Sequence, residues 1–209
     1  MSYHGLISHA KRHLLSIDTP LVLEVGVDRG VTYITLAYFL ARARENFVII
    51  GVDIKVQEQV QIMLMSIDRN RQQQQCYLYE RNSLDFLPEL EANSNKFDVV
   101  LLDGDHNYYT VSKELEMINN ITHGESIVIV DDAQEGSRWA NRDLFYATRE
   151  DYDKVLDATA PIETEKHGVR PAVLDFVEAH GWKIASPVRG EPVVLCRSED
   201  VLKKFCEGT

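Results

Sequence analysis

The sequence predicts an α/β fold in which a mostly parallel sheet carries helices on both faces. Short, β-branched apolar runs alternate along the chain with longer amphipathic segments. Three of these runs end in acids, at Asp53, at Asp103 and at the pair Asp131–Asp132, and a glycine-punctuated turn lies within residues 21–32. Buried parallel strands have this composition, and their carboxyl ends face the crevice in which open α/β sheets bind ligands. These observations therefore predict a nucleotide-type ligand at the carboxyl edge of the sheet.

The spacing of apolar residues predicts each element in turn. Amphipathic segments with apolar residues near helical spacing predict helices at 3–16, 31–44, 56–69, 84–92, 108–119 and 169–180. Continuous apolar runs predict strands at 21–26, 47–53, 76–80, 97–102, 126–130, 182–186 and 192–196. The polar run from Gln72 to Gln75 is expected to be an exposed connection. Because strands and helices alternate, we expect a doubly wound sheet with right-handed crossovers, closed by a terminal antiparallel strand.

Length, composition and charge narrow the class of protein. With 209 residues, 44% of them hydrophobic, one core and a single domain over 1–209 are expected. No apolar run approaches the roughly 18 residues that span a bilayer, and residues 1–15 are too polar for a signal-peptide core. A formal net charge of -11 argues against nucleic acid as the main partner, because that affinity comes largely from clustered Lys and Arg. We expect neither a membrane nor a nucleic-acid partner, and a homo-oligomer stays open.

The cysteines bear on the cellular compartment. The chain has three, which is an odd number, and they lack metal-type spacing: Cys76, Cys196 and Cys206. This usage indicates reduced thiols and a cytoplasmic location.

The glycine turn combines features of a ligand-binding loop. Gly26 and Gly30 allow backbone to approach a ligand closely, and the helix that follows offers free N–H groups at its start, where Thr32 lies. Asp53 follows Gly26 by 27 residues, a spacing suited to holding ribose hydroxyls. The alternative is a strand-to-helix turn in which glycine only relieves backbone strain.

Acidic residues in the turn restrict the ligand. The pattern is not G-x-G-x-x-G, because Asp28 stands where a pyrophosphate would meet negative charge. Glu24 and Asp28 suit an ammonium or sulfonium group better than phosphates, which disfavours a nicotinamide oxidoreductase.

Four features occur in order along residues 21–132. They are E-x-G-x-x-x-G-x-T from Glu24, an acid ending the second strand, Asn82-Ser83 after the third, and an acid ending the fourth. This order resembles the class I S-adenosylmethionine-dependent methyltransferases. The closer resemblance is to the metal-dependent O-methyltransferases, both the catechol and caffeoyl-CoA type and the macrolide-sugar and aminocoumarin type, which favours Asp-Asp after the fifth strand. The resemblance implies a Rossmann-like fold and S-adenosylmethionine as cofactor, and residues 167–182 match more weakly.

The same resemblance implies roles for individual residues. The methionine half of the cofactor would lie among Glu24, Gly26, Gly30 and Thr32. Asp53 would hold the ribose hydroxyls, and Ser83 would lie beside the adenine. Asp103 would contact the cofactor and, with Asp131 and Asp132, bind a metal ion.

The chemistry of the three carboxylates supports a metal independently of the family. Three carboxylates at strand ends with no cysteine nearby form a hard oxygen site, suited to Mg²⁺ or another divalent cation such as Mn²⁺ or Ca²⁺. Such an ion would lower the pKa of a substrate hydroxyl. The alternative is that Asp103 caps the helix expected at 108–119 and that the Asp131–Asp132 pair caps a following helix.

His106 is the candidate general base. It stands three residues after Asp103, where the catechol and caffeoyl-CoA enzymes have a lysine, so this chain departs from the family there. A histidine can accept a proton near neutral pH, but a neighbouring carboxylate such as Asp105 would raise its pKa and weaken it as a base unless a cation opposes that effect. A surface or capping role for His106 is the alternative.

The charged, weakly periodic segment 133–168 is expected to form a lid over the substrate. Arg138 and Trp139 could offer stacking and anion contacts within it, and Tyr108 could wall the pocket. The alternative is a solvated loop with a short helix.

The function predicted from these observations is methyl transfer from S-adenosylmethionine to a hydroxyl of a small molecule, assisted by a divalent metal. Two alternatives remain at this stage: a metal-independent methyltransferase, in which the acids cap helices or transfer protons, and a non-catalytic nucleotide-binding domain. The retained acids Glu24, Asp53 and Asp103, together with Gly26, argue against the latter.

Overall fold

The computed structural model describes residues 3–68, 74–94, 96–148, 158–185 and 192–206. In this part of the chain, seven strands form one sheet in the order β3-β2-β1-β4-β5-β7-β6. Their bounds are β1 Leu21–Val25, β2 Phe47–Asp53, β3 Gln74–Glu80, β4 Phe97–Leu102, β5 Thr122–Val130, β6 Lys183–Ile184 and β7 Val193–Cys196. Strands β1 to β5 run parallel, and β7 runs antiparallel to both β5 and β6. The predicted doubly wound sheet with a terminal antiparallel strand is confirmed.

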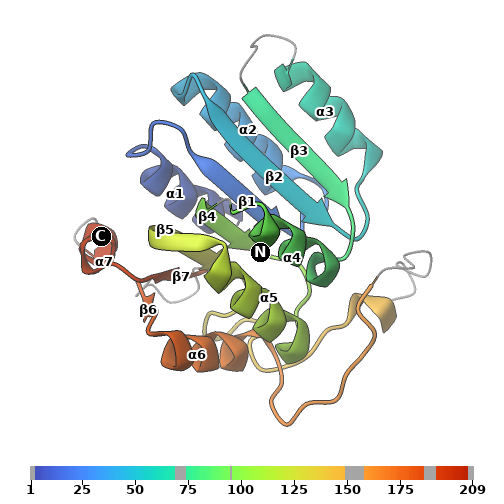
Figure 1. Cartoon of the computed structure of the whole chain (residues 1–209). Helices are drawn as coiled ribbons and strands as arrows, with labels where there is room; N and C mark the ends of the chain where they lie inside the picture. The colour runs from blue at the N-terminus through green and yellow to red at the C-terminus, as the bar shows by residue number, and fades with distance from the viewer. Residues whose placement is uncertain (1–2, 69–73, 95, 149–157, 186–191, 207–209) are drawn as a thin grey trace.

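Helices cover both faces of this sheet (Figure 1). Their bounds are α1 Tyr3–Leu14, α2 Val31–Ala43, α3 Glu58–Asp68, α4 Ser83–Ala92, α5 Tyr108–Asn120, α6 Val169–His180 and α7 Glu199–Cys206, with a 3₁₀ turn, η1, at Tyr146–Thr148. Apolar residues of α1, α2, α3 and α7 form one core with the sheet, and those of α4, α5 and α6 form a second core on its other face. Among the described residues, no helix is both long enough and apolar enough to span a membrane.

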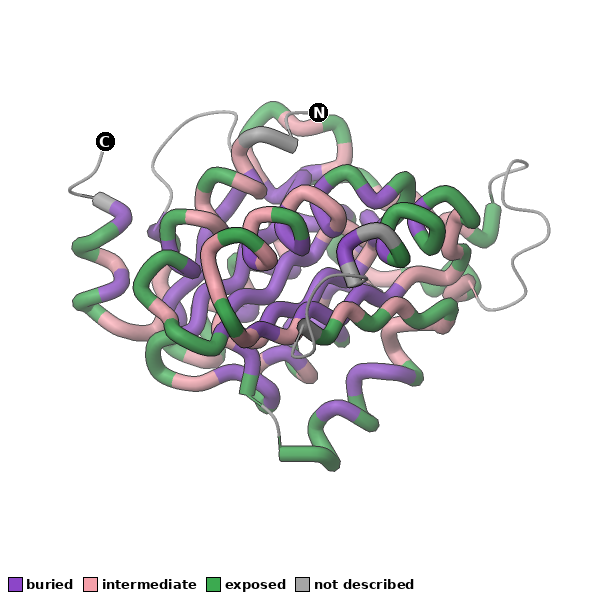
Figure 2. The backbone as a smooth tube through the Cα atoms, turned by 90° about the horizontal axis from the view of Figure 1, so that it is seen from above, coloured by how far each residue is buried: buried purple, intermediate pink, exposed green. Residues whose placement is uncertain are grey.

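Alternation along the strands creates the two cores. Val22 of β1 packs toward α1 and α2, whereas its neighbours Leu23 and Val25 pack toward α4 and α5, as side chains of a strand alternate between faces. Figure 2 shows the result, with buried strands between helices whose outer sides are exposed. The central strands are thus fully covered, and only their ends reach solvent, where the site lies.

Three elements differ most from the sequence prediction. Strand β5 begins at Thr122, four residues before the expected start at 126, and Thr122 pairs with Phe97 of β4. Strand β3 begins at Gln74, so Gln74 and Gln75 pair with Phe47 and Val48 of β2 although we expected an exposed connection there. Strand β3 is an edge strand, and its backbone pairing needs no apolar side chain. Helix α7 was not predicted, because it is short and its burial rests mainly on Val201 and on Phe205 one turn later.

Candidate active site

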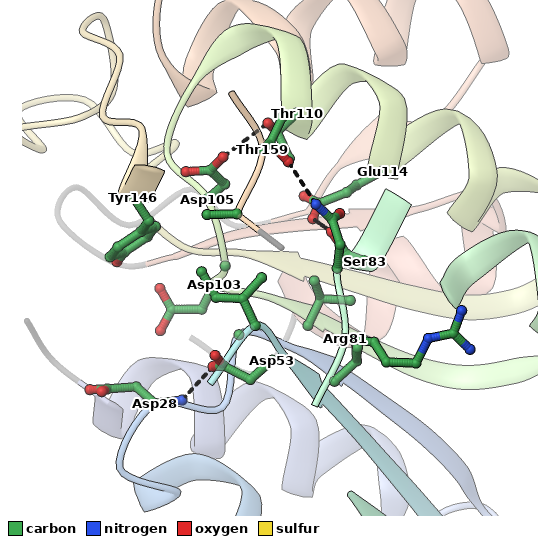
Figure 3. Close-up of a pocket in the computed structure, with 17 residues that line it drawn as sticks. Asp28, Asp53, Arg81, Ser83, Asp103, Asp105, Thr110, Glu114, Tyr146 and Thr159 are labelled. Carbon is green, nitrogen blue, oxygen red and sulfur yellow. Dashed lines mark hydrogen bonds between the residues drawn. The ribbon is translucent and has the colours of Figure 1, made fainter. Parts of the chain in front are cut away.

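A cavity opens at the carboxyl edge of the sheet, beside the ends of β1, β2, β3 and β4 (Figure 3). Its lining residues come from six segments that are distant in sequence: Val25, Gly26, Asp28, Val52, Asp53, Ile54, Arg81, Asn82, Ser83, Asp103, Gly104, Asp105, Thr110, Glu114, Tyr146, Ala158 and Thr159. The position agrees with the prediction of a ligand site where the strand order reverses between β1 and β4. Of the predicted cofactor residues, the cavity brings together Gly26, Asp53, Ser83 and Asp103.

The glycine turn has a left-handed backbone at three alternate residues. The φ angles are +87° at Gly26, +45° at Asp28 and +75° at Gly30. A Cβ on Gly26 would lie 2.2 Å from the carbonyl oxygen of Asp103, so only glycine permits the ends of β1 and β4 to meet. A Cβ on Gly30 would lie 2.8 Å from Val60 of α3, and Gly30 does not line the cavity. Gly30 is therefore explained by helix packing, and Gly26 both closes the turn and lines the cavity.

Asp53 holds the glycine turn through its carboxylate. Its Oδ2 accepts hydrogen bonds from the backbone N–H of Val27 at 2.7 Å and of Asp28 at 2.8 Å, and its Oδ1 accepts from the N–H of Lys55 at 2.9 Å. Burial raises the pKa of Asp53, although these N–H donors oppose the rise. The residue predicted to bind ribose thus also shapes the loop, and its carboxylate faces the cavity with further lone pairs.

Glu24 and Thr32 lie behind the turn and do not line the cavity. Both are buried, and Glu24 Oε2 has no hydrogen-bond partner among the described residues. Burial, followed by the negative charges of Asp103 and Asp53, raises the pKa of Glu24 well above its usual range. Direct contact between these two residues and a ligand stays a prediction, since neither residue lines the cavity.

Ser83 and Glu114 meet at the far end of the cavity. Ser83 is the first residue of α4, and its hydroxyl donates a 2.6 Å hydrogen bond to Oε1 of Glu114 on α5. Asn82 caps α4 by accepting from the N–H of Leu84, and its amide donates to Thr159 at 3.2 Å. The last contact ties the segment after residue 157 to the wall of the cavity.

His106 is buried between two carboxylates. Its Nε2 lies 2.9 Å from Oδ2 of Asp132 and 3.5 Å from Oδ1 of Asp103, and the ring is 3% exposed. Burial alone would lower the pKa of His106, but contact with Asp103 and Asp132 and their charges outweigh it and raise the pKa to about 10. The partners that raise the pKa of His106 are those two acids rather than Asp105.

The three predicted metal ligands lie at the ends of β4 and β5. Burial and then the charge of Asp103 raise the pKa of Asp131 to about 6. Burial would raise the pKa of Asp132, but His106 and the hydroxyl of Ser137 lower it. Asp132 also has a left-handed φ of +57°, an uncommon conformation for a residue other than glycine that is found at functional sites.

The side chains of this cluster are of the type that binds a hard divalent cation, but they are not arranged as the ligands of a metal ion are. They are carboxylates, whose oxygens are the ligands that hard divalent cations prefer. In the described part of the chain, however, no three His, Cys, Asp or Glu side chains are arranged to hold a metal ion, and His106 lies against two of the three acids. A bound cation would offset the negative charge of Asp103 and Asp132, the two carboxylates beside which His106 now lies.

The three predicted substrate residues do not line the cavity. The guanidinium of Arg138 stacks 4.5 Å from the ring of Trp139, and the hydroxyl of Tyr108 donates to Asp175 of α6. Asp143 holds this region together, since its Oδ1 accepts from the N–H of Tyr108 at 2.8 Å and from that of Gly168 at 2.7 Å.

The expected lid at 133–168 is described in two parts. Residues 133–148 are irregular apart from η1, and Tyr146 lines the cavity, as do Ala158 and Thr159 after the gap. Leu144 pairs with His106 through a backbone bridge, its N–H donating to the carbonyl of His106 at 2.9 Å. Residues 149–157 lie outside the described residues. The segment borders the cavity, and its closure over substrate stays a prediction.

Several cavity residues were not found by sequence reasoning, chiefly Asp105, Glu114 and Tyr146. For Glu114 a signal existed: it falls on the same face of α5 as Val111, Leu115 and Ile118, so a charged residue interrupts an apolar helical stripe. No short-range pattern distinguishes Tyr146 from the other aromatic residues of its segment.

The fold and site together define a class I S-adenosylmethionine-dependent methyltransferase. The sheet order, the antiparallel β7 beside β5 and the cavity at the carboxyl ends of β1, β2 and β4 are the defining features. A family model described as "Methyltransferase domain" matches residues 23–133, more than half of the 209 residues, and the chain belongs to this family. It is an enzyme that transfers a methyl group from S-adenosylmethionine.

Comparison with solved structures supports the fold. CalS11, described as a TDP-rhamnose 3'-O-methyltransferase of calicheamicin biosynthesis, is similar with a TM-score of 0.65 and 17% identity, over 93% of this chain and 79% of that one. MNMC2 from Aquifex aeolicus is similar with a TM-score of 0.57 and 11% identity, over 97% of this chain and 63% of that one. A search of curated proteins finds no significant match.

Proposed function

We propose that this methyltransferase acts on a hydroxyl group of a small molecule, and that a divalent cation assists it. The observation that carries the proposal is the cluster of Asp103, Asp131, Asp132 and His106, which adjoins the donor cavity at the ends of β4 and β5. Asp103 lines the cavity and also contacts His106, so the cluster lies where a methyl acceptor would meet the donor.

In this proposal the donor lies along the cavity in the order of the strands. Asp103 and Asp28 lie near Gly26 and favour the positive ammonium and sulfonium groups, while Asp53 accepts hydrogen bonds from the ribose hydroxyls. Ser83 then lies at the end that receives the base. This arrangement orients the methyl group toward the acidic cluster.

A cation would be held by Asp103, Asp131 and Asp132. When bound, it would supply positive charge that lowers the pKa of a substrate hydroxyl. The residues of the chain supply the rest: the carboxylates fix the position of the acceptor, and His106 accepts its proton. Because the contacts with Asp103 and Asp132 raise the pKa of His106 to about 10, this step requires their charge to be neutralised by another cation, which lowers the pKa of the imidazole.

A metal-independent methyltransferase is the second candidate, and the contact between His106 and Asp132 favours it. Nε2 of His106 already lies beside two of the buried carboxylates, at 2.9 Å from Asp132 and 3.5 Å from Asp103, so the chain itself supplies a group that can offset part of their charge. In that case the acids would serve proton transfer and loop geometry, and the acceptor would be a group that ionises without a metal.

The test is methyl transfer from labelled S-adenosylmethionine to a panel of hydroxylated acceptors. Each reaction is run with Mg²⁺, with EDTA after verified metal removal, and with Mg²⁺ restored. We expect turnover of at least one acceptor, loss of turnover in EDTA and recovery on restoring Mg²⁺. Turnover that is unchanged in EDTA would support the metal-independent candidate.

A further inference from the structure

Glu114 is a buried acid for which the methyl-transfer chemistry has no use. It lies on α5 with none of its surface exposed, on the apolar side of the helix next to Leu115 and Val111. Burial, and to a lesser extent the charge of Asp105, raises its pKa to about 8 although the hydrogen bond from Ser83 opposes the rise. An uncompensated buried acid is costly, so a hydrogen-bonding role is the natural explanation for its place beside the cavity.

The contact with Ser83 fixes the hydroxyl of that serine. A serine hydroxyl has one proton to donate and lone pairs to accept with. In the 2.6 Å bond from Ser83 Oγ to Glu114 Oε1, the serine is the donor and the carboxyl oxygen accepts, which uses that proton. What Ser83 offers to a ligand in the cavity is therefore an acceptor only.

The side chain of the neighbouring Asn82 is already engaged in hydrogen bonds within the protein. The carbonyl oxygen of the Asn82 side chain accepts from the N–H of Leu84, and its amide donates to Thr159. Figure 3 shows Ser83 and Glu114 together on the side of the cavity away from Tyr146. Both residues line the cavity.

The order of the strands says which part of the donor reaches this place. From β4 through β1 and β2 to β3, the cavity passes Asp103, then Asp53, then Ser83. A donor whose sulfonium lies at Asp103 and whose ribose lies at Asp53 has its purine base beside Ser83. This step rests on the donor orientation proposed above.

We propose that Glu114 is a positioning residue that selects the exocyclic amino group of the donor's adenine by holding the Ser83 hydroxyl as a pure hydrogen-bond acceptor. An amino group donates to that acceptor. A carbonyl oxygen at the same position of the base is itself an acceptor. Its lone pairs would face those of the Ser83 hydroxyl, and no hydrogen bond would form.

The test compares two ligands that differ at this position, S-adenosylhomocysteine and its deaminated analogue S-inosylhomocysteine, by calorimetry. Wild type should bind the adenosyl compound on the order of tenfold more tightly, as expected for one hydrogen bond lost and one acceptor left unpaired. Glu114→Leu frees the Ser83 proton to turn toward the cavity, so this preference should shrink severalfold. Glu114→Gln keeps a carbonyl acceptor for Ser83 and should retain the preference.

Two further variants separate selection from general damage. Ser83→Ala removes the acceptor and should lose the preference even if Glu114→Leu fails to fold. Glu116→Leu, on the exposed side of the same helix, should leave the ratio of the two affinities unchanged. An unchanged ratio in folded Glu114→Leu, or in Ser83→Ala, would overturn the role of Glu114 alone. If wild type bound neither compound, the donor assignment itself would fail.

Discussion

The two halves of the site are organised by contacts of different kinds. In the donor half, Asp53 of β2 binds the glycine turn that follows the adjacent β1, and Ser83 follows the next strand, β3. In the acceptor half, the contacts join strand ends to an irregular segment: His106 meets Asp132, and Asp143 joins Tyr108 to Gly168. A half built from consecutive strand–helix units has a local sequence signature. A half that depends on an irregular segment does not.

The largest effect expected tests the acceptor half at its centre. His106→Ala should lower kcat by about 10²–10⁴, because it removes the proposed base. Affinity for S-adenosylhomocysteine should stay nearly unchanged, since His106 does not line the donor cavity. The measurement is steady-state turnover of an acceptor found in the panel, together with calorimetry. His180→Ala, at the end of α6, is the control. Near-wild-type turnover of His106→Ala would show that His106 is only a structural partner of Asp132.

The next effect tests the donor half. Asp53→Ala should weaken binding of S-adenosylhomocysteine by about 2–4 kcal/mol, through loss of charge-assisted hydrogen bonds to the ribose and of the acceptor that holds the turn. The melting temperature should fall as well, because the N–H groups of Val27 and Asp28 lose their partner. Calorimetry and thermal unfolding measure the two effects. Equal affinity in wild type and Asp53→Ala would contradict the donor orientation, and Asp18→Ala, at an exposed position, is the control.

Glu114 gives a pH dependence that belongs to the donor half. A carboxyl whose pKa rises from 4.5 to about 8 on folding binds its proton more tightly in the folded protein. Its contribution to the free energy of unfolding is therefore complete below about pH 4.5, falls as the pH rises and levels off above about pH 8, by up to about 1.4 kcal/mol per pH unit. Urea unfolding of wild type and Glu114→Gln between about pH 5 and pH 8 isolates this group, because other titrations cancel. As the pH rises, the free energy of unfolding of wild type should fall relative to that of Glu114→Gln. A constant difference would show that Glu114 is ionised at neutral pH.

What the sequence could predict follows the same division. The bounds of β2, β4 and α6 are as predicted, since each depends on a local apolar pattern closed by an acid, a histidine or a glycine. Gly26, Asp53, Ser83 and Asp103 line one cavity, because parallel strands end at one edge of the sheet. The packing role of Gly30 could not be predicted from the sequence, because the side chain that packs against it, Val60, belongs to another helix. Nor could the pKa of His106, which depends on burial and on Asp132, a residue 26 positions away in sequence.

The smallest effect expected concerns Asp143, which holds the acceptor half without lining the cavity. Its carboxylate accepts from two backbone N–H groups and contacts Nδ1 of His167 at 2.6 Å, so it joins the start of α5, the start of α6 and the segment between β5 and η1. Asp143→Ala should lower the free energy of unfolding by about 1–3 kcal/mol, as expected when partly buried N–H groups lose their acceptor. Asp143→Asn keeps an acceptor oxygen and should lose less. Because Leu144 is paired with the carbonyl of His106, turnover should fall with stability while affinity for S-adenosylhomocysteine stays the same. Urea unfolding, turnover and calorimetry on the same preparations check all three. A loss of donor affinity equal to the loss of turnover would show that the two halves of the site are not held independently.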